Sequence, residues 1–129
     1  MRGQVLALLL VIAAMGCTPA PAGSTYAITG VALAGPTCGA EPASPVPGHC
    51  APRPVAGAVL VLTDTGGHEV VRVTTAQDGS WTVALAVGTY TLTPQPVSGL
   101  LGTARPVEVV VRPGAVPTGV QIEYDTGIR

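Results

Sequence analysis

Cysteine and histidine are the side chains of this 129-residue sequence best suited to covalent or metal chemistry. Cys38 and Cys50 flank a Pro-rich segment that contains Glu41 and His49. If the chain is exported, two thiols are expected to form a disulfide, which here would close a loop over 35–53. The alternative is a metal site built from these four residues, but their spacing includes neither Cys-x-x-Cys nor paired histidines. We therefore expect a Cys38–Cys50 disulfide and no metal.

The remaining ionisable groups are few and dispersed along the sequence. Asp64, His68 and Ser80 could serve as orienter, base and nucleophile if their two turns lay at one end of the fold. Asp64 and Asp78 could also offer oxygen ligands to Ca²⁺, although that ion takes about six to eight. Aspartates are common in turns because their carboxylates bond the local backbone. The sequence therefore favours turn-forming roles, and it predicts no enzyme activity, no catalytic residue and no cofactor.

The charge balance bears on one class of partner. The basic side chains, apart from two histidines, are six arginines, against seven acids, and the chain has no lysine, asparagine or phenylalanine. Proteins that bind nucleic acid present a concentrated basic surface to the phosphates. No basic stripe exists in this sequence, so we expect no nucleic-acid partner.

The first residues have the pattern of an export signal. Arg2 precedes an unbroken apolar run over 5–15. A bilayer span needs about 20 apolar residues, so the run is too short to cross a membrane, but it suits the core of a signal peptide. The sequence therefore predicts a cleaved signal peptide.

The pair Gly16-Cys17 follows this run and resembles the cleavage site of bacterial lipoprotein leaders, in which the cysteine receives the lipid. The resemblance implies a lipoprotein signal peptide over 1–16, and a lipidated Cys17 with a Pro-rich tether over 17–25. It also implies anchoring to the cell membrane, on its outer face or periplasmic side, through the lipid alone. The alternative is ordinary cleavage near Ala22, which would give a secreted soluble protein.

The rest of the chain reads as short strands separated by Gly, Pro and Asp. Alternation of apolar and polar residues at period two is typical of strands with one buried face, and no helical spacing occurs after the leader. The sequence therefore predicts an all-β domain over 26–129, a single seven-stranded antiparallel β-sandwich. The expected strands are 26–34, 56–63, 69–75, 80–86, 89–93, 107–112 and 116–124.

Four segments of this domain resemble the carboxypeptidase regulatory-like, transthyretin-like sandwich domain, here in a small bacterial lipoprotein: 28–31, 55–64, 74–83 and 88–92. The resemblance implies an Ig-like (prealbumin-like) fold and an accessory or interaction role without chemistry. Asp78-Gly79 is expected to form a tight hairpin turn, because Gly accepts positive φ. The other motif residues, Gly57, Trp81, Gly88 and Tyr90, are likewise expected to be structural.

Three surfaces remain as candidates for recognition. The disulfide loop carries His49 and Arg53 near its end, and loops on a rigid scaffold often carry function. A later loop has adjacent Leu100 and Leu101, which would either face a partner or be buried against the end of the sandwich. The C-terminal tail ends in Arg129, and chain termini commonly fray. These five residues are therefore the candidates for an interaction surface.

The sequence supports several functional hypotheses of different classes. The first is a non-enzymatic interaction module displayed on the cell envelope, which binds a protein or a cell-wall polymer. The second is a structural spacer or docking subunit of a larger envelope complex, which would use sheet edges. A carbohydrate or small-molecule carrier is the weakest hypothesis, because the one Trp is needed in the core.

Overall fold

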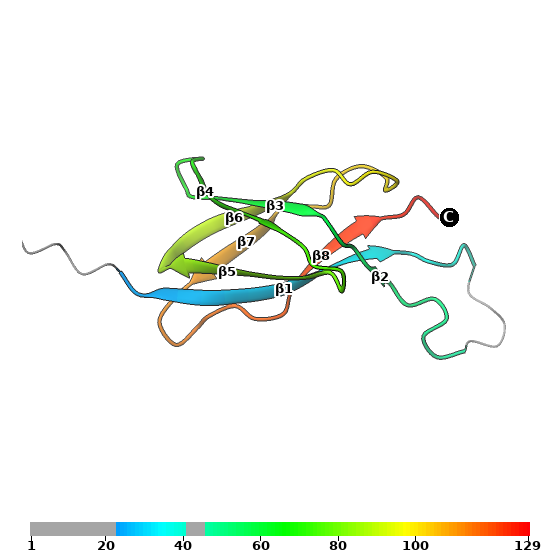
Figure 1. Cartoon of the computed structure of the whole chain (residues 1–129), viewed down its shortest axis with the longest axis horizontal. Helices are drawn as coiled ribbons and strands as arrows, with labels where there is room; N and C mark the ends of the chain where they lie inside the picture. Colours follow the sequence, from blue (N-terminus) through cyan, green and yellow to red (C-terminus); the bar gives the residue numbers. More distant parts are fainter. Residues whose placement is uncertain (1–22, 41–45) are drawn as a thin grey trace, which may run out of the picture.

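The computed structural model describes residues 23–40 and 46–129, so the leader, Cys17 and Glu41 lie outside the described residues. The described chain contains eight strands and no helix, which confirms the all-β prediction (Figure 1). No helix in this part of the chain is long and apolar enough to cross a membrane. The strands are β1 (Thr25–Gly35), β2 (Arg53–Pro54), β3 (Val59–Thr63), β4 (Glu69–Thr74), β5 (Ser80–Ala86), β6 (Gly88–Pro94), β7 (Val107–Val111) and β8 (Val120–Asp125).

The strand count differs from the expected seven because of β2. This element has only two residues, Arg53 and Pro54, which pair with Ala34 and Leu33 of β1. A segment so short shows no alternation, and proline is depleted in strands because it lacks a backbone donor. The sequence pattern therefore predicts no strand at β2: Arg53 falls in the expected disulfide loop, and Pro54 lies before the next expected strand.

The strands form two four-stranded sheets. The first sheet is built on β1, and the second has the order β4-β3-β6-β7. The amide of Ala32 donates to the Gly79 carbonyl, and its carbonyl accepts from the Val55 amide. The start of β5 and the end of β2 thus lie along the same edge of β1, while β8 occupies the other edge. The long strand β1 is consequently the interior strand of its sheet.

The expectation of a wholly antiparallel fold is wrong for one pair of strands. β1 and β8 run parallel, with Gly30 opposite Val120 and Gly35 opposite Asp125. All other strand pairs are antiparallel. Side-chain alternation indicates which face of a strand is buried but carries no information on the direction of its neighbour. The parallel pairing of the first and last strands could not be read from the pattern.

A shared core lies between the two sheets. β5 alternates strictly, with Trp81, Val83 and Leu85 buried and their neighbours exposed. The inward residues of β1 and β8 meet those of β3, β6 and β7 in one apolar cluster. The chain is thus a β-sandwich-like molecule. The largest fully buried side chains are Tyr124, Ile28, Leu60, Leu62, Leu85, Leu92, Ile122, Val109, Val111 and Pro94.

Trp81 occupies a position that depends on a glycine. Gly30 pairs with Trp81 across β1 and β5, and a Cβ on Gly30 would overlap the Trp81 ring and the Val120 carbonyl oxygen. Trp81 is only 3% exposed. The absence of a side chain at residue 30 therefore makes room for the indole.

The turn at Asp78-Gly79 does not close a hairpin, contrary to the expectation, because β4 and β5 belong to different sheets. The local chemistry of the turn is nevertheless as predicted. Gly79 has φ +78°, and the Asp78 carboxylate accepts hydrogen bonds from the Ser80 amide (3.0 Å) and hydroxyl (2.6 Å). This turn carries the chain from one sheet to the other. The chain crosses back between β5 and β6, which begins at Gly88.

One buried polar side chain ties the start of β3 to the end of β4. The Thr75 hydroxyl donates to the Val55 carbonyl (2.6 Å) and accepts from the Ala58 amide (2.9 Å). The Gly57 amide donates to the Thr75 carbonyl, and Gly57 has φ +73°, a value that glycine adopts without strain. The hydroxyl of Thr75 therefore satisfies two backbone groups that water cannot reach.

Candidate interaction site at the loop end

The three expected recognition segments lie at one end of the domain, which we call the loop end. Its described parts are residues 36–40 and 46–52 of the disulfide loop, the loop over 95–106 and the tail over 126–129 (Figure 1). The described chain begins at the opposite end, at the start of β1, and β1 runs the length of the domain to the loop end. The loop end is thus the part of the fold where irregular segments are concentrated.

The disulfide loop contains the predicted covalent bond. Cys38 and Cys50 are bonded, with Cα atoms 5.4 Å apart, which confirms the expected pairing. The Thr37 hydroxyl donates to the Ala51 carbonyl (3.1 Å) and joins the two stems of the loop next to the disulfide. His49 is exposed. The loop is therefore fastened at its base by a covalent bond and a hydrogen bond.

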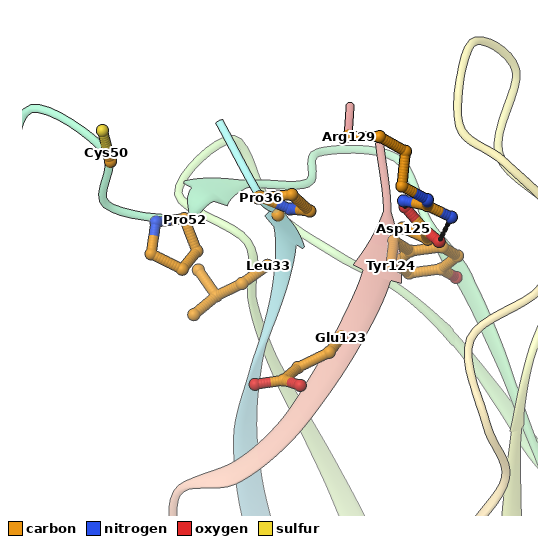
Figure 2. A pocket seen from close by; sticks show the side chains of 9 residues that line it. Leu33, Pro36, Cys50, Pro52, Glu123, Tyr124, Asp125 and Arg129 are labelled. Carbon is orange, nitrogen blue, oxygen red and sulfur yellow. Dashed lines mark hydrogen bonds and ion pairs between the residues drawn. The ribbon is translucent and has the colours of Figure 1, made fainter. Parts of the chain in front are cut away.

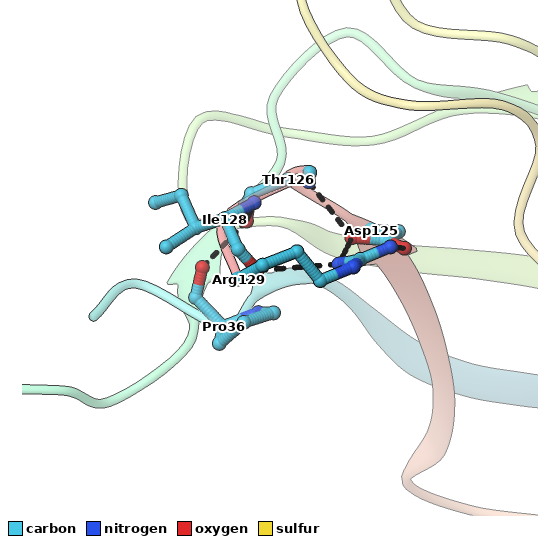
Figure 3. A network of polar contacts seen from close by, with 6 residues as sticks. Pro36, Asp125, Thr126, Ile128 and Arg129 are labelled. Atoms are coloured by element: carbon cyan, nitrogen blue, oxygen red, sulfur yellow. Dashed lines mark hydrogen bonds and ion pairs between the residues drawn. The ribbon is translucent and has the colours of Figure 1, made fainter. Parts of the chain in front are cut away.

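The C-terminal tail is folded back onto the end of β1 (Figure 3). The Thr126 amide donates to the Gly35 carbonyl (3.1 Å), and the Thr126 hydroxyl donates to the Pro36 carbonyl (2.5 Å). Arg129 donates to both carboxylate oxygens of Asp125, at 3.1 and 2.9 Å. We call residues 125–129 with these contacts the C-terminal clasp. Hydrogen bonds thus hold the tail against β1, although chain termini commonly fray.

The electrostatics of the clasp follow from its hydrogen bonds. The hydrogen bond from Arg129 is the largest of the effects that lower the pKa of Asp125, and the bond from the Gly127 amide adds to it. The same pairing raises the pKa of Arg129. Burial raises the pKa of the neighbouring Tyr124 hydroxyl, which donates to the Gln95 carbonyl (2.9 Å). The clasp is therefore held by an ion pair at neutral pH.

A groove of about 570 Å³ lies between the disulfide loop, the end of β1 and the clasp (Figure 2). Its apolar lining comes from Leu33, Pro36 and Pro52, and its charged lining comes from the outward face of β8 and the tail. Gln121 donates to Glu123 across that outward face (3.3 Å). The charged lining residues are Glu123, Asp125 and Arg129. An open groove with an apolar floor and a charged rim suits an extended polar chain with apolar groups.

Two further hollows adjoin the loop over 95–106. One of about 450 Å³ lies between Leu101 and the β8 residues Glu123 and Asp125. A smaller one, about 220 Å³, lies between Arg53 and Leu100. The two leucines differ: Leu100 packs partly buried against the core, whereas Leu101 is 57% exposed. The loop end thus offers three neighbouring recesses on one part of the surface.

The catalytic and calcium combinations that the sequence left as alternatives are not assembled. Asp64 and His68 lie in the turn between β3 and β4, where the Asp64 carboxylate accepts from the His68 amide (2.9 Å) and lies 3.4 Å from the ring nitrogen Nδ1. Ser80 and Asp78 lie beyond the other end of β4. Six residues of extended strand separate the pairs by about 20 Å. Neither a triad nor a shared cation site can form from them.

The lowered pKa values of Asp64 and Asp78 also have local causes. For Asp64, the largest lowering effect is the hydrogen bond from the His68 amide. For Asp78, it is the hydrogen bond from the Ser80 hydroxyl. Both carboxylates therefore act as acceptors within their own turns, as the sequence favoured.

None of the motif residues lines the three loop-end recesses. Trp81 and Tyr90 are buried in the core, and the Tyr90 hydroxyl donates to the Ala86 carbonyl (2.9 Å). The sequence analysis identified Cys50 and Arg129 of the groove but missed its strand residues, above all Leu33 and Glu123. They sit on the outward face of two paired strands, where they are opposite each other in register. Only knowledge that β1 pairs with β8 could have brought them together.

No family model matches the chain, and no curated protein matches it. Among solved structures, the Bacillus anthracis TIE protein is similar to the chain, with a TM-score of 0.47 and 16% sequence identity. The match covers 77% of this chain but only 16% of that protein's chain. The geometry of the loop end is therefore the basis for a functional proposal.

Proposed function

We propose that this protein is a non-enzymatic interaction module whose loop end binds another protein at the cell envelope. The observation that carries the proposal is that the two ends of the domain differ. The chain arrives at one end of β1, and the three recesses gather around the other end. Eleven residues of extended strand hold those two ends about 36 Å apart.

The placement of the recesses at the end opposite the start of β1 suits a protein anchored by its N-terminus. We propose that Cys17 is lipidated after removal of residues 1–16, and that residues 17–25 form the tether. A Pro-rich tether is semi-rigid and keeps a domain off the membrane surface. An anchor at the start of β1 would leave the loop end pointing away from the membrane, where a partner can reach it.

We further propose that the domain has an Ig-like, transthyretin-like sandwich fold related to carboxypeptidase regulatory-like domains. Support comes from the two-layer arrangement, the Asp78-Gly79 turn and the buried aromatic residues Trp81 and Tyr90. Residues of this motif that fill the core are not free for chemistry. A role in recognition without catalysis is consistent with their placement.

The groove favours an extended peptide of a partner protein over a compact small molecule. It is open, and its floor combines Leu33 with two prolines, against which an extended chain can lie. Glu123 is exposed at its rim and could pair with a basic side chain of the partner. A cell-wall polymer is the other ligand class that an open groove of this kind could hold.

Photo-crosslinking in cells tests the proposal. A photoreactive residue is placed at Leu101 in the loop end and, in a matched control, at Val87, which is 53% exposed and lies between β5 and β6. We expect a discrete crosslinked partner from position 101 and none from position 87. Equal patterns from both positions, or no product from position 101, would contradict the proposal.

A structural docking role is favoured by one observation at a different place. β4 is an edge strand of its sheet, and Val70 on it is 48% exposed. Exposed edges can accept a further strand from another chain. A photoreactive residue at Val70 that captures a partner, with none captured at Leu101, would replace the interaction module with a docking subunit.

A further inference from the structure

The disulfide loop brings three metal-ligating side chains together. Cys38, His49 and Cys50 each offer one ligand atom, and these atoms lie within 4.8 Å of one another. His49 is exposed, and the two sulfurs are bonded to each other. We propose that reduction of the Cys38–Cys50 disulfide converts this loop into a binding site for a thiophilic divalent cation, with Zn²⁺ as the reference ion.

The geometry of the cluster fits a zinc site with two thiolates and one imidazole. Zinc takes Zn–S bonds of about 2.3 Å and Zn–N bonds of about 2.0–2.1 Å in a tetrahedron, which places the ligand atoms roughly 3.5–3.8 Å apart. The Cα atoms of the two cysteines are 5.4 Å apart. Rotation of the three side chains can therefore bring their ligand atoms to these separations without moving the strands. The fourth position would be left to water.

The backbone of the loop is held by contacts that do not depend on the disulfide. The His49 amide donates to the Val46 carbonyl (3.0 Å), and the Ala51 amide donates to the Gly48 carbonyl (3.3 Å). The hydrogen bond from Thr37 to Ala51 joins the two stems. These contacts fix the segment that carries His49 and Cys50 and keep it beside Cys38. A reduced loop thus retains its ligands close together.

The conversion is balanced in atoms and electrons. With a phosphine as reductant, phosphorus supplies two electrons that break the S–S bond, and one water molecule supplies two protons to the sulfurs. The water oxygen ends in the phosphine oxide. Zn²⁺ then displaces the two thiol protons, because thiolates and neutral imidazole are the forms that bind zinc. The loop therefore has two alternative cross-links, a covalent bond or a metal ion.

The test uses the full chain with Cys17→Ser, which leaves Cys38 and Cys50 as its only cysteines. The protein is reduced with a phosphine, freed of reductant without oxygen and titrated with Co²⁺, whose thiolate complexes absorb in the near ultraviolet. Zn²⁺ is then added as the competitor. Circular dichroism follows the β fold throughout. His49→Ala removes one ligand, and His68→Ala is the matched control, since His68 is exposed in the turn between β3 and β4.

We expect one Co²⁺ per reduced chain, displacement by Zn²⁺, and no thiolate band from the oxidised chain. His49→Ala should weaken binding by more than about tenfold, because loss of even a second-shell partner costs about 10- to 100-fold. His68→Ala should bind as the parent does. The proposal is overturned if the reduced chain gives no thiolate band, if it loses its β spectrum in the presence of Zn²⁺, or if His49→Ala binds as tightly as the parent. None of these outcomes depends on the proposed partner at the loop end.

Discussion

Replacement of Thr75 by valine tests how the start of β3 is held to the end of β4. Valine has nearly the shape of threonine, so the change removes the hydroxyl and leaves the packing in place. The Ala58 amide then loses its acceptor, and the Val55 carbonyl loses its donor. A buried backbone group without a partner costs about 1–3 kcal/mol, and the added methyl recovers roughly 0.8 kcal/mol. With two such groups, we expect Thr75→Val to lower the free energy of unfolding by about 1–5 kcal/mol.

Urea denaturation followed by circular dichroism measures this change. A loss of this size lowers the Tm of a domain of about 100 residues by roughly 5–25 °C. Thr75→Ser keeps the hydroxyl and should cost about 1 kcal/mol, the value of a buried methyl. Thr82→Val, at an exposed position of β5, should stay within about 0.5 kcal/mol of the parent. If Thr75→Val also stayed within about 0.5 kcal/mol, the hydroxyl would not be satisfying buried groups.

Three further changes have expected outcomes. Trp81→Ala should lower the free energy of unfolding by about 3–5 kcal/mol in a urea titration, because it leaves a large cavity in the core; a loss below about 1 kcal/mol would contradict its burial. Gly30→Ala should cost about 1–3 kcal/mol in the same assay, since its Cβ overlaps the indole, and an unchanged midpoint would refute that contact. The pKa of Asp125 is lowered, mainly by Arg129, so the clasp is stable above the ordinary carboxyl pKa and is lost as the pH falls through the lowered value. An NMR titration of the Gly127 amide should therefore show a midpoint below 3.8, the ordinary aspartate value, and a midpoint at or above it would exclude the ion pair.

Much of the fold could be predicted because burial imposes period two on each strand. β5 alternates throughout, and the expected range over 80–86 agrees with the observed Ser80–Ala86. The partners of a strand leave no such mark. The sequence therefore predicted neither the parallel pairing of β1 with β8 nor the passage of the chain between sheets at Asp78-Gly79.

The candidate site was only partly predictable, because the sequence pattern does not show which strands pair or in which direction they run. His49, Arg53, Leu100, Leu101 and Arg129 could be singled out because they lie in irregular segments. That these segments share one end of the domain depends on strand direction. Their roles in the structure also differ, since Arg129 is paired with its own tail and Leu100 is half-buried.

The parallel pairing of β1 and β8 has a mechanical consequence. β1 begins at one end of the domain, and β8 ends at the other, so tension applied between the two chain ends is directed along both strands (Figure 1). All the hydrogen bonds between β1 and β8 must then break at the same time for one strand to slide past the other. Strands pulled from the same end would instead separate one hydrogen bond at a time. β1 is also bonded along its other edge to β5 and β2. Force applied between the start of β1 and the clasp would therefore load many of these hydrogen bonds at once.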